Sequence, residues 1–265
     1  MRKVKLSIVT VCYNSSKTIS NCIESVLRQN NNNYEYIIID GASDDGTVEI
    51  AKTYKEKFEE KDIKYTIISE PDLGIYNAMN KGIDRASGEW ILYLNSDDEF
   101  YGNKAIRDFL NSDFDSYDVV YGDVVIKTKD SYIFQKAGEL ERLKSGTEMP
   151  FCHQSTFTKT SILKQFHFDE NYKIIADIDL YLRILENNGQ FCYIEQYISI
   201  FSNEGVSQTN RIKSIREAKV MLKHHAELNI MKEMKLNSFI IWYRLKSVLP
   251  VRIQNNIKKL LKGKL

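Results

Sequence analysis

Two adjacent carboxylates, Asp97 and Asp98, directly follow a short apolar stretch from Trp90 to Leu94 in this chain of 265 residues. Nearly continuous apolar side chains are typical of a strand buried on both faces of a parallel sheet, so the acids are predicted at its carboxyl end. Ligands of open α/β sheets bind just outside the carboxyl ends of the strands. The pair could therefore hold a divalent cation and a polar ligand, although Asn, Ser and Asp also favour ordinary turns.

A third acid, Asp40, ends an earlier apolar strand, and the elements around it repeat a pattern of strand followed by helix. We predict strands over Leu6 to Cys12, Tyr36 to Ile39 and Ile63 to Ile68, and helices from about Lys17 (capped by Ser15 or Ser16), over Val48 to Phe58, and over Ile75 to Ala86. This repetition favours a Rossmann-like parallel sheet. Asp40 and the Asp97/Asp98 pair would then lie on the same rim.

Three stretches of the chain resemble the family 2 glycosyltransferases. They are Ser7 to Asn14, Ile38 to Thr47, and Glu70 to Gly82 together with Leu94 to Asp98. The resemblance implies the GT-A fold, an α/β structure with a Rossmann-like, mostly parallel central sheet flanked by helices. It also implies transfer of a sugar from a nucleotide diphosphate donor with inversion. The family often has Asp-Gly-Ser where this chain has Gly41-Ala42-Ser43, which leaves the roles of Asp44 and Asp45 open.

The resemblance also implies roles for single residues. Asp40 would hydrogen-bond the uracil ring, Asp97 the ribose hydroxyls, and Asp98 a divalent metal. The further donor-binding residues expected within the same stretches are Thr10, Tyr13, Asn14, Asp72 and Asn80. A hard cation would stabilise the negative charge on the departing diphosphate. Mg²⁺ and Mn²⁺ both suit carboxylate and phosphate oxygens, so the sequence does not choose between them.

Inversion by direct displacement needs a general base for the acceptor hydroxyl, and Asp177 is our candidate. It falls in the first turn of a helix predicted from the apolar face of Ile178, Tyr181, Leu182 and Leu185, where an acid also suits the helix dipole. The segment resembles the acidic motif of the family's acceptor-side helix, with Asp179 as the alternative base.

Two further segments leave their roles open. His153 and Gln154 could contact the diphosphate or the acceptor, or could be structural residues. Glu204 to Ser207 resembles a loop near the family's active site, but an ordinary turn explains it equally well.

Composition predicts a cytoplasmic enzyme. The chain is 43% hydrophobic and 28% charged, which is typical of a globular protein. Its four cysteines lack zinc or redox spacing, so reduced cysteines are expected. We find no signal cleavage site and no run approaching the ~20 apolar residues of a membrane span. The segment Val4 to Ser20 contains no Gly, which argues against a pyrophosphorylase, and a dinucleotide dehydrogenase would need a Gly-x-Gly-x-x-Gly turn.

The last residues carry an uneven charge, because eight Lys and Arg but no acid follow Glu233. Residues 231–265 are therefore predicted to form a basic amphipathic tail. Through residues 235–265 it could contact an anionic membrane surface at the inner face of the cell membrane. It could instead pack on the core or on a second subunit. Its apolar content exceeds what phosphate binding needs, so no nucleic acid partner is expected.

We therefore expect a single GT-A domain over residues 1–230, with a nucleotide-sugar-binding half (1–99) and an acceptor-binding half (100–210). The expected function is transfer of one sugar from a UDP-sugar to a growing glycan. By resemblance, the acceptor would be a polyprenyl-diphosphate-linked repeat of a bacterial capsule, O-antigen or exopolysaccharide. The alternative is a non-catalytic member that binds nucleotide sugar or scaffolds an assembly complex.

Overall fold

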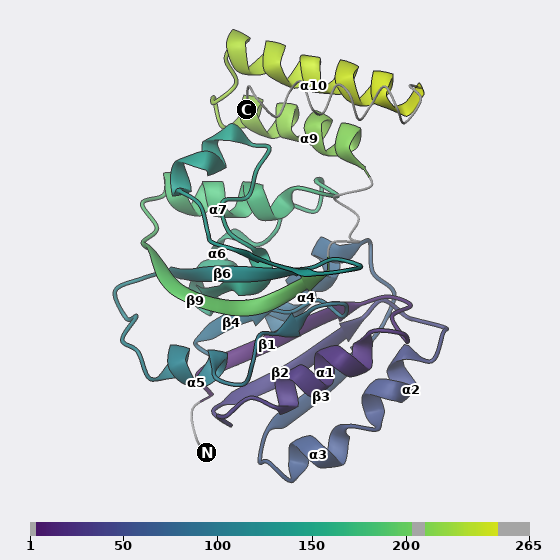
Figure 1. Cartoon of the computed structure of the whole chain (residues 1–265). Coiled ribbons are helices and arrows are strands. Elements are labelled where there is room, and N and C mark those ends of the chain that lie inside the picture. The colour runs from purple at the N-terminus through teal and green to yellow at the C-terminus, as the bar shows by residue number, and fades with distance from the viewer. Residues whose placement is uncertain (1–3, 203–209, 249–265) are drawn as a thin grey trace.

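The computed structural model describes residues 4–202 and 210–248, in which helices cover both faces of one sheet (Figure 1). The strands are β1 (Leu6–Cys12), β2 (Tyr34–Asp40), β3 (Lys64–Ser69), β4 (Trp90–Tyr93), β5 (Glu99–Phe100), β6 (Val119–Lys127), β7 (Tyr132–Gln135), β8 (Thr156–Lys159) and β9 (Phe191–Ser202). The α-helices are α1 (Ile19–Leu27), α2 (Thr47–Lys52), α3 (Lys55–Glu59), α4 (Ile75–Arg85), α5 (Ala105–Leu110), α6 (Thr160–Phe166), α7 (Ala176–Glu186), α9 (Arg211–His224) and α10 (Ile230–Val248). Two short 3₁₀ helices are η1 (Leu140–Ser145) and η2 (His153–Ser155).

The strands follow the order β3-β2-β1-β4-β8-β6-β9-β5, and β7 pairs with β6. The first four strands run parallel, in a register that sets Cys12 opposite Asp40 and Asp40 opposite Ser69. β8 is antiparallel to both of its neighbours, β6 is parallel to β9, and β5 is antiparallel to β9. The carboxyl ends of β1, β2, β3 and β4 therefore share one rim, which is where the sequence placed its acids.

Every residue of β1, β2 and β4 is buried, as expected from their apolar runs. The first strand has the predicted bounds, and the other three predicted strands differ by one or two residues at their ends. The α/β fold class is confirmed. Two local predictions are wrong. The helix predicted over Val48 to Phe58 is two short helices, α2 and α3.

The cap predicted for the first helix is also wrong. Helix α1 begins at Ile19, and no side chain caps it. Instead the Ser15 carbonyl accepts hydrogen bonds from the backbone N–H groups of Thr18 and Ile19. These two backbone hydrogen bonds, both 3.0 Å long, take the place of the expected serine side-chain cap.

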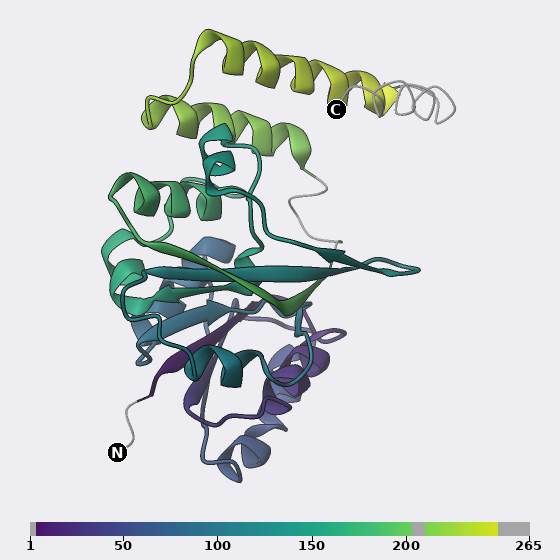
Figure 2. The same ribbon diagram turned by 60° about the vertical axis from the view of Figure 1, so that its left-hand side comes forward.

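Two apolar cores lie on opposite faces of the sheet. One is formed largely with α1, α3 and α5, and the other with α4, α6, α7 and α9. Helices α9 and α10 stack as a hairpin beyond α7, and α10 is the outermost layer in both views (Figures 1 and 2). The predicted C-terminal tail is helical as far as Val248, and the rest of the tail lies outside the described residues. No helix within residues 4–202 and 210–248 is both long and apolar enough to cross a bilayer.

Candidate active site

The loops that follow β1 and β2 are held together by hydrogen bonds between them. Three backbone N–H groups of the first loop donate to side chains of the second: Asn14 N to Ser43 Oγ (2.8 Å), Ser15 N to Thr47 Oγ1 (2.8 Å) and Ser16 N to Asp45 Oδ2 (2.9 Å). In the other direction, Asp44 N of the second loop donates to Asn14 Oδ1 at 3.1 Å. The Thr47 hydroxyl and the Ser16 N–H hold the pKa of Asp45 below its usual range. Asp45 therefore joins the two loops, and Asn14 does the same.

Asp40 ends β2 with a fully buried carboxylate that already has several donors. It accepts from Ser43 N (2.9 Å), from the Ser43 hydroxyl, from Ser69 Oγ (2.7 Å) and, weakly, from Cys12 Sγ (3.5 Å). A carboxylate has about four acceptor positions, so all are occupied. To accept a hydrogen from a nucleobase, Asp40 must exchange one of the two serine hydroxyls.

Tyr13, Gly41 and Asp72 lie together at the rim, although they follow three different strands. A Cβ on Gly41 would come within 2.4 Å of Asp72 Oδ2 and 3.4 Å of the Tyr13 ring. A larger residue at position 41 would therefore require the Asp72 carboxylate to move. Tyr13 is 65% exposed, and Asp72 accepts from Gly74 N at 2.8 Å. An exposed aromatic face beside a carboxylate is suited to a flat, polar ligand such as a nucleobase.

Asp98 is 1% exposed, and its two oxygens differ. Oδ1 accepts from Ser202 N at 2.9 Å, whereas Oδ2 is buried without a hydrogen-bond partner among the described residues. Burial and, secondarily, the charge of Asp97 raise the pKa of Asp98 well above its usual range, while the Ser202 N–H and the Gln154 side chain, which makes no hydrogen bond to Oδ2, oppose this rise. Asp97 itself reaches the surface, and desolvation raises its pKa as well. A cation at Oδ2 would favour the ionised form, so Asp98 fits a metal ligand.

The protein supplies few other metal ligands. Within residues 4–202 and 210–248 no three His, Cys, Asp or Glu side chains group so as to hold a metal ion. A cation at Asp98 would thus take most of its ligands from a bound diphosphate and from water, as Mg²⁺ commonly does.

The unpartnered buried side-chain atoms of the described residues belong to four residues, Asn95, Asp98, Asp123 and His153. β4, β8 and β6 are adjacent, with Leu92 opposite Phe157 and Phe157 opposite Val120. Asn95 and Asp98 follow β4, His153 precedes β8, and Asp123 lies three residues beyond Val120. All four therefore lie toward the same end of the sheet. Buried polar atoms are normally paired, so the unpartnered oxygens of Asn95, Asp98 and Asp123 single out this end of the sheet as the candidate place for a polar ligand, whereas the His153 ring packs among Tyr93, Phe168 and Tyr181.

Asp123 was not predicted, because it lies within β6 in a stretch that the sequence presents only as strand. Its Oδ1 accepts from Ala137 N and from the Tyr193 hydroxyl, both at 3.0 Å. The register of β6 with β9 shifts on both sides of Asp123, so the strand is irregular there. Such bulges often re-aim a side chain next to an active site. The local sequence around Asp123 gives no sign of this bulge.

The turn Cys152 to Ser155, which includes η2, directly precedes β8. Burial chiefly, and the charges of Asp98 and Asp177 to a lesser extent, raise the pKa of the Cys152 thiol. The thiol donates to Gln154 Oε1 at 2.9 Å. His153 stacks on Tyr93 with 5.2 Å between ring centroids, and burial lowers its pKa to about 4, so the imidazole is neutral at physiological pH.

Asp177 is the second residue of α7. Its Oδ1 accepts from Ile178 N at 2.9 Å and from the Tyr76 hydroxyl at 3.3 Å. The single hydroxyl hydrogen of Tyr76 is shared between Asp177 and the closer Ile174 O, at 2.8 Å, and Tyr76 thereby ties α4 to the start of α7. Burial raises the pKa of Asp177 to about 6. A carboxylate with this pKa is ionised at neutral pH and basic enough to accept a proton during a reaction.

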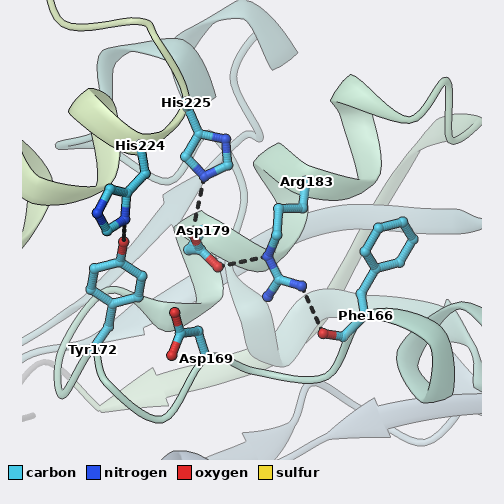
Figure 3. A pocket seen from close by; sticks show the side chains of 7 residues that line it. All are labelled: Phe166, Asp169, Tyr172, Asp179, Arg183, His224 and His225. Carbon is cyan, nitrogen blue, oxygen red and sulfur yellow. Dashed lines mark hydrogen bonds and ion pairs between the residues drawn. The ribbon is translucent and has the colours of Figure 1, made fainter.

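Asp179, the alternative base, points away from this cluster. Its oxygens bind Arg183 Nε (2.8 Å) and His225 Nε2 (3.0 Å) and line a cavity of about 420 Å³ beside α9 (Figure 3). Burial alone would raise the pKa of Asp179, but the His225 hydrogen bond and the Arg183 charge lower it. A carboxylate that is bound by Arg183 and His225 and whose pKa is lowered is poorly suited to act as a base.

Thr10 and Asn80 are bound within the protein. The Thr10 hydroxyl is fully buried, donates to Leu94 O at 2.7 Å and lies 2.9 Å from the Tyr36 hydroxyl. Asn80 Nδ2 donates to Phe168 O (3.0 Å) and to Glu170 (2.8 Å). Neither side chain offers a free group to a donor in this structure. Glu204 to Ser207 lies outside the described residues.

Comparisons with known proteins give a consistent result. The family model described as glycosyl transferase family 2 matches residues 7–174. A PGL/p-HBAD biosynthesis glycosyltransferase of Mycobacterium tuberculosis is 30% identical over 185 residues, which cover 68% of this chain and 70% of that protein. The amylovoran biosynthesis glycosyltransferase AmsB of Erwinia amylovora is 28% identical over 211 residues, covering 74% of this chain and 69% of AmsB.

Solved structures share the fold. TarS residues 1–349 of Staphylococcus aureus, in complex with UDP-GlcNAc, has a TM-score of 0.64 and 19% identity, and the match covers 82% of this chain and 66% of that one. The mannosyltransferase PcManGT of Pyrobaculum calidifontis, in complex with GDP-Man and Mn²⁺, has a TM-score of 0.65 and 15% identity, covering 98% of this chain and 81% of that one.

Proposed function

The chain belongs to the family 2 glycosyltransferases and has their GT-A fold, and from this premise we propose that it transfers one sugar from a UDP-sugar to a hydroxyl group of a growing glycan. The observation that carries the proposal is the presence of two carboxyl groups in unusual surroundings: Asp98 has a buried oxygen without a partner, and Asp177 has a pKa raised to about 6. Asp98 would hold a cation at the departing diphosphate, and Asp177 would accept the proton of the attacking hydroxyl.

The loops after the first strands would bind the nucleotide. Asp40 would accept the uracil N3 hydrogen after exchange of a serine hydroxyl, and Tyr13 and Asp72 would border the base. Asp97, which reaches the surface next to Asp98, would accept from the ribose hydroxyls. Asn14 would act by holding the loop after β2 in place.

Asp98 would hold a divalent cation, Mg²⁺ or Mn²⁺, which when bound stabilises the negative charge on the departing diphosphate. The PcManGT complex contains Mn²⁺, which supports a metal in this fold. Asp177 would take the acceptor proton as the hydroxyl attacks the anomeric carbon from the face opposite the diphosphate, which gives inversion. Tyr76 would keep the Asp177 carboxylate directed toward the acceptor.

The acceptor would be a lipid-linked glycan, such as a polyprenyl-diphosphate-linked repeat of a bacterial surface polysaccharide. The name of AmsB, an amylovoran biosynthesis glycosyltransferase, supports a glycan product. Under this proposal residues 1–99 bind the donor and residues 100–210 bind the acceptor within one domain.

The test is release of nucleotide from a panel of UDP-sugars and GDP-mannose, with Mg²⁺, Mn²⁺ or chelator. We expect metal-stimulated UDP release from at least one UDP-sugar and its loss in Asp177→Asn. GDP-mannose is the matched control, because it is the donor bound in PcManGT. If GDP-mannose alone is turned over, the uridine assignment is wrong. If every donor binds by calorimetry but none is turned over, the chain is the non-catalytic binding member considered above.

A further inference from the structure

Helix α10 exposes a stripe of large apolar side chains along its outer side. Met234 is 67% exposed, Ile241 59% and Leu245 50%, and Ile230 and Met231 at its start are more exposed still. At 3.6 residues per turn, positions 230, 234, 241 and 245 fall on one side of the helix. Isolated exposed apolar residues are ordinary, but several large ones on one side of a surface helix mark an interaction site, and here Asn237 and Ser238 are the polar residues that separate the two halves of the stripe.

The opposite side of α10 accounts for the packing of the helix. Leu236 is buried, and Phe239, Ile240 and Tyr243 pack partly buried against the core that includes α9. These residues lie on the far side of the helix axis from Met234 and Ile241. Folding of the described residues therefore requires only one apolar side of α10, and the second apolar side is left for a partner.

Charge indicates what kind of partner this is. Residues 210–248 contain nine Lys and Arg against three Asp and Glu, whereas residues 4–202 contain 21 against 32. The single acid of α10, Glu233, is paired with Lys219 of α9 at 2.9 Å. Lys235 and Lys246 lie on the flank of α10 between the stripe and the inner side, each over an aromatic ring of the inner side. A cationic helical layer on an acidic body is complementary to an anionic surface.

We propose that the outer stripe of α10, formed by Ile230, Met231, Met234, Ile241 and Leu245, lies on the surface of an anionic lipid bilayer with the helix axis in the membrane plane. The apolar side chains would enter the boundary between headgroups and acyl chains while the bordering lysines meet the anionic headgroups. The acidic body would be repelled, so the chain would bind with α10 toward the membrane. This proposal does not depend on sugar transfer.

The experiment is co-sedimentation of the full chain with vesicles of phosphatidylcholine alone or with 30% phosphatidylglycerol as the probe. We expect binding only to the anionic vesicles, and weaker binding at high salt. The double variant Met234→Glu/Ile241→Glu should lose at least tenfold in affinity. Lys235→Gln/Lys246→Gln should lose roughly fivefold per charge. Ile133→Glu on β7 is the matched control, since Ile133 is also 50% exposed, and it should bind like the wild type.

Circular dichroism and light scattering on the same samples make each outcome decisive. The proposal is overturned if the wild-type chain does not bind the anionic vesicles. It is also overturned by a well-folded Met234→Glu/Ile241→Glu variant that binds like the wild type. If the wild type is a dimer that this variant dissociates, without any vesicle binding, the stripe is an interface between copies of the chain. Hydrolysis of a soluble donor by the same variants reports separately on the proposed function and should be unchanged.

Discussion

Replacing Asp177 by Asn distinguishes a catalytic base from a residue that only caps its helix, because only the catalytic role predicts a loss of turnover. Asn keeps the size of the side chain and an oxygen that can accept from Ile178 N, but it cannot take a proton. If Asp177 is the base, turnover should fall by about 10²- to 10⁴-fold, while UDP affinity stays near the wild-type value.

The stability change follows from the pKa of Asp177, which burial raises from 3.8 to about 6. Because the folded-state pKa is the higher one, the protonated group favours folding below about pH 4, and this contribution is lost as pH rises through about 6. At pH 8 the ionised group costs the folded state up to about 3 kcal/mol, from about two units at 1.36 kcal/mol each. Asp177→Asn should thus raise the free energy of unfolding at pH 8 and leave it nearly unchanged at pH 4.

A residue that only caps its helix would behave differently. Asp177→Asn would then leave turnover intact, whereas the pH dependence of stability, which follows from burial, would be the same for either role. The assay combines initial rates of UDP release at saturating donor between pH 5 and 9, urea unfolding at pH 4 and pH 8, and calorimetric titration with UDP. Asp179→Asn is the control, because it breaks the contacts with Arg183 and His225 and should destabilise the chain with little change in turnover per folded molecule. Wild-type turnover in Asp177→Asn would refute our assignment of the base.

Four further changes have expected outcomes. Asp98→Ala should abolish metal-dependent UDP release while the fold stays intact, and calorimetry should show that Mn²⁺ binding in the presence of UDP is lost as well. Wild-type activity that survives a chelator would contradict the metal role. Asp40→Ala should weaken UDP binding by roughly 1.5 to 3 kcal/mol, and GDP that competes as well as UDP would contradict the nucleobase assignment. Tyr76→Phe removes a hydrogen bond that lowers the pKa of Asp177, so the acid limb of the pH–rate profile should move to higher pH. His225→Gln should lower the free energy of unfolding at pH 6 by about 1 to 3 kcal/mol but less at pH 9, because contacts with carboxylates raise the pKa of His225 and its stabilisation is lost as pH rises through that value.

The sequence predicted the strand framework well because buried parallel strands are nearly continuous apolar runs. β1 and α4 were located almost to the residue, and Asp40, Asp97 and Asp98 lie at the predicted rim. Helix ends were harder to predict. Ser15 looked like a cap, but its hydroxyl bonds Ser96 across the rim at 2.8 Å, a partner 81 residues away.

Single side chains were the least predictable part of the site. Thr10 and Asn80 lie in stretches that resemble a donor site, yet their polar groups are satisfied by the protein itself. Asp123 and Tyr76 were not singled out, because their importance comes from neighbours on other strands and helices. Local patterns show whether a residue is in a strand, but not which oxygen is left without a partner.

The hydrogen bonds between the loops after β1 and β2 have a consequence for the entropy of binding. Ordering one residue of a flexible loop costs roughly 1 to 2 kcal/mol, and a ligand that must order its own binding loop loses that amount from its affinity. Here Asn14, Ser43, Asp45 and Thr47 hold the two loops in one arrangement before any nucleotide arrives. Choice between nucleotides at this rim must therefore come from fit to a preformed surface rather than from loop folding around the base.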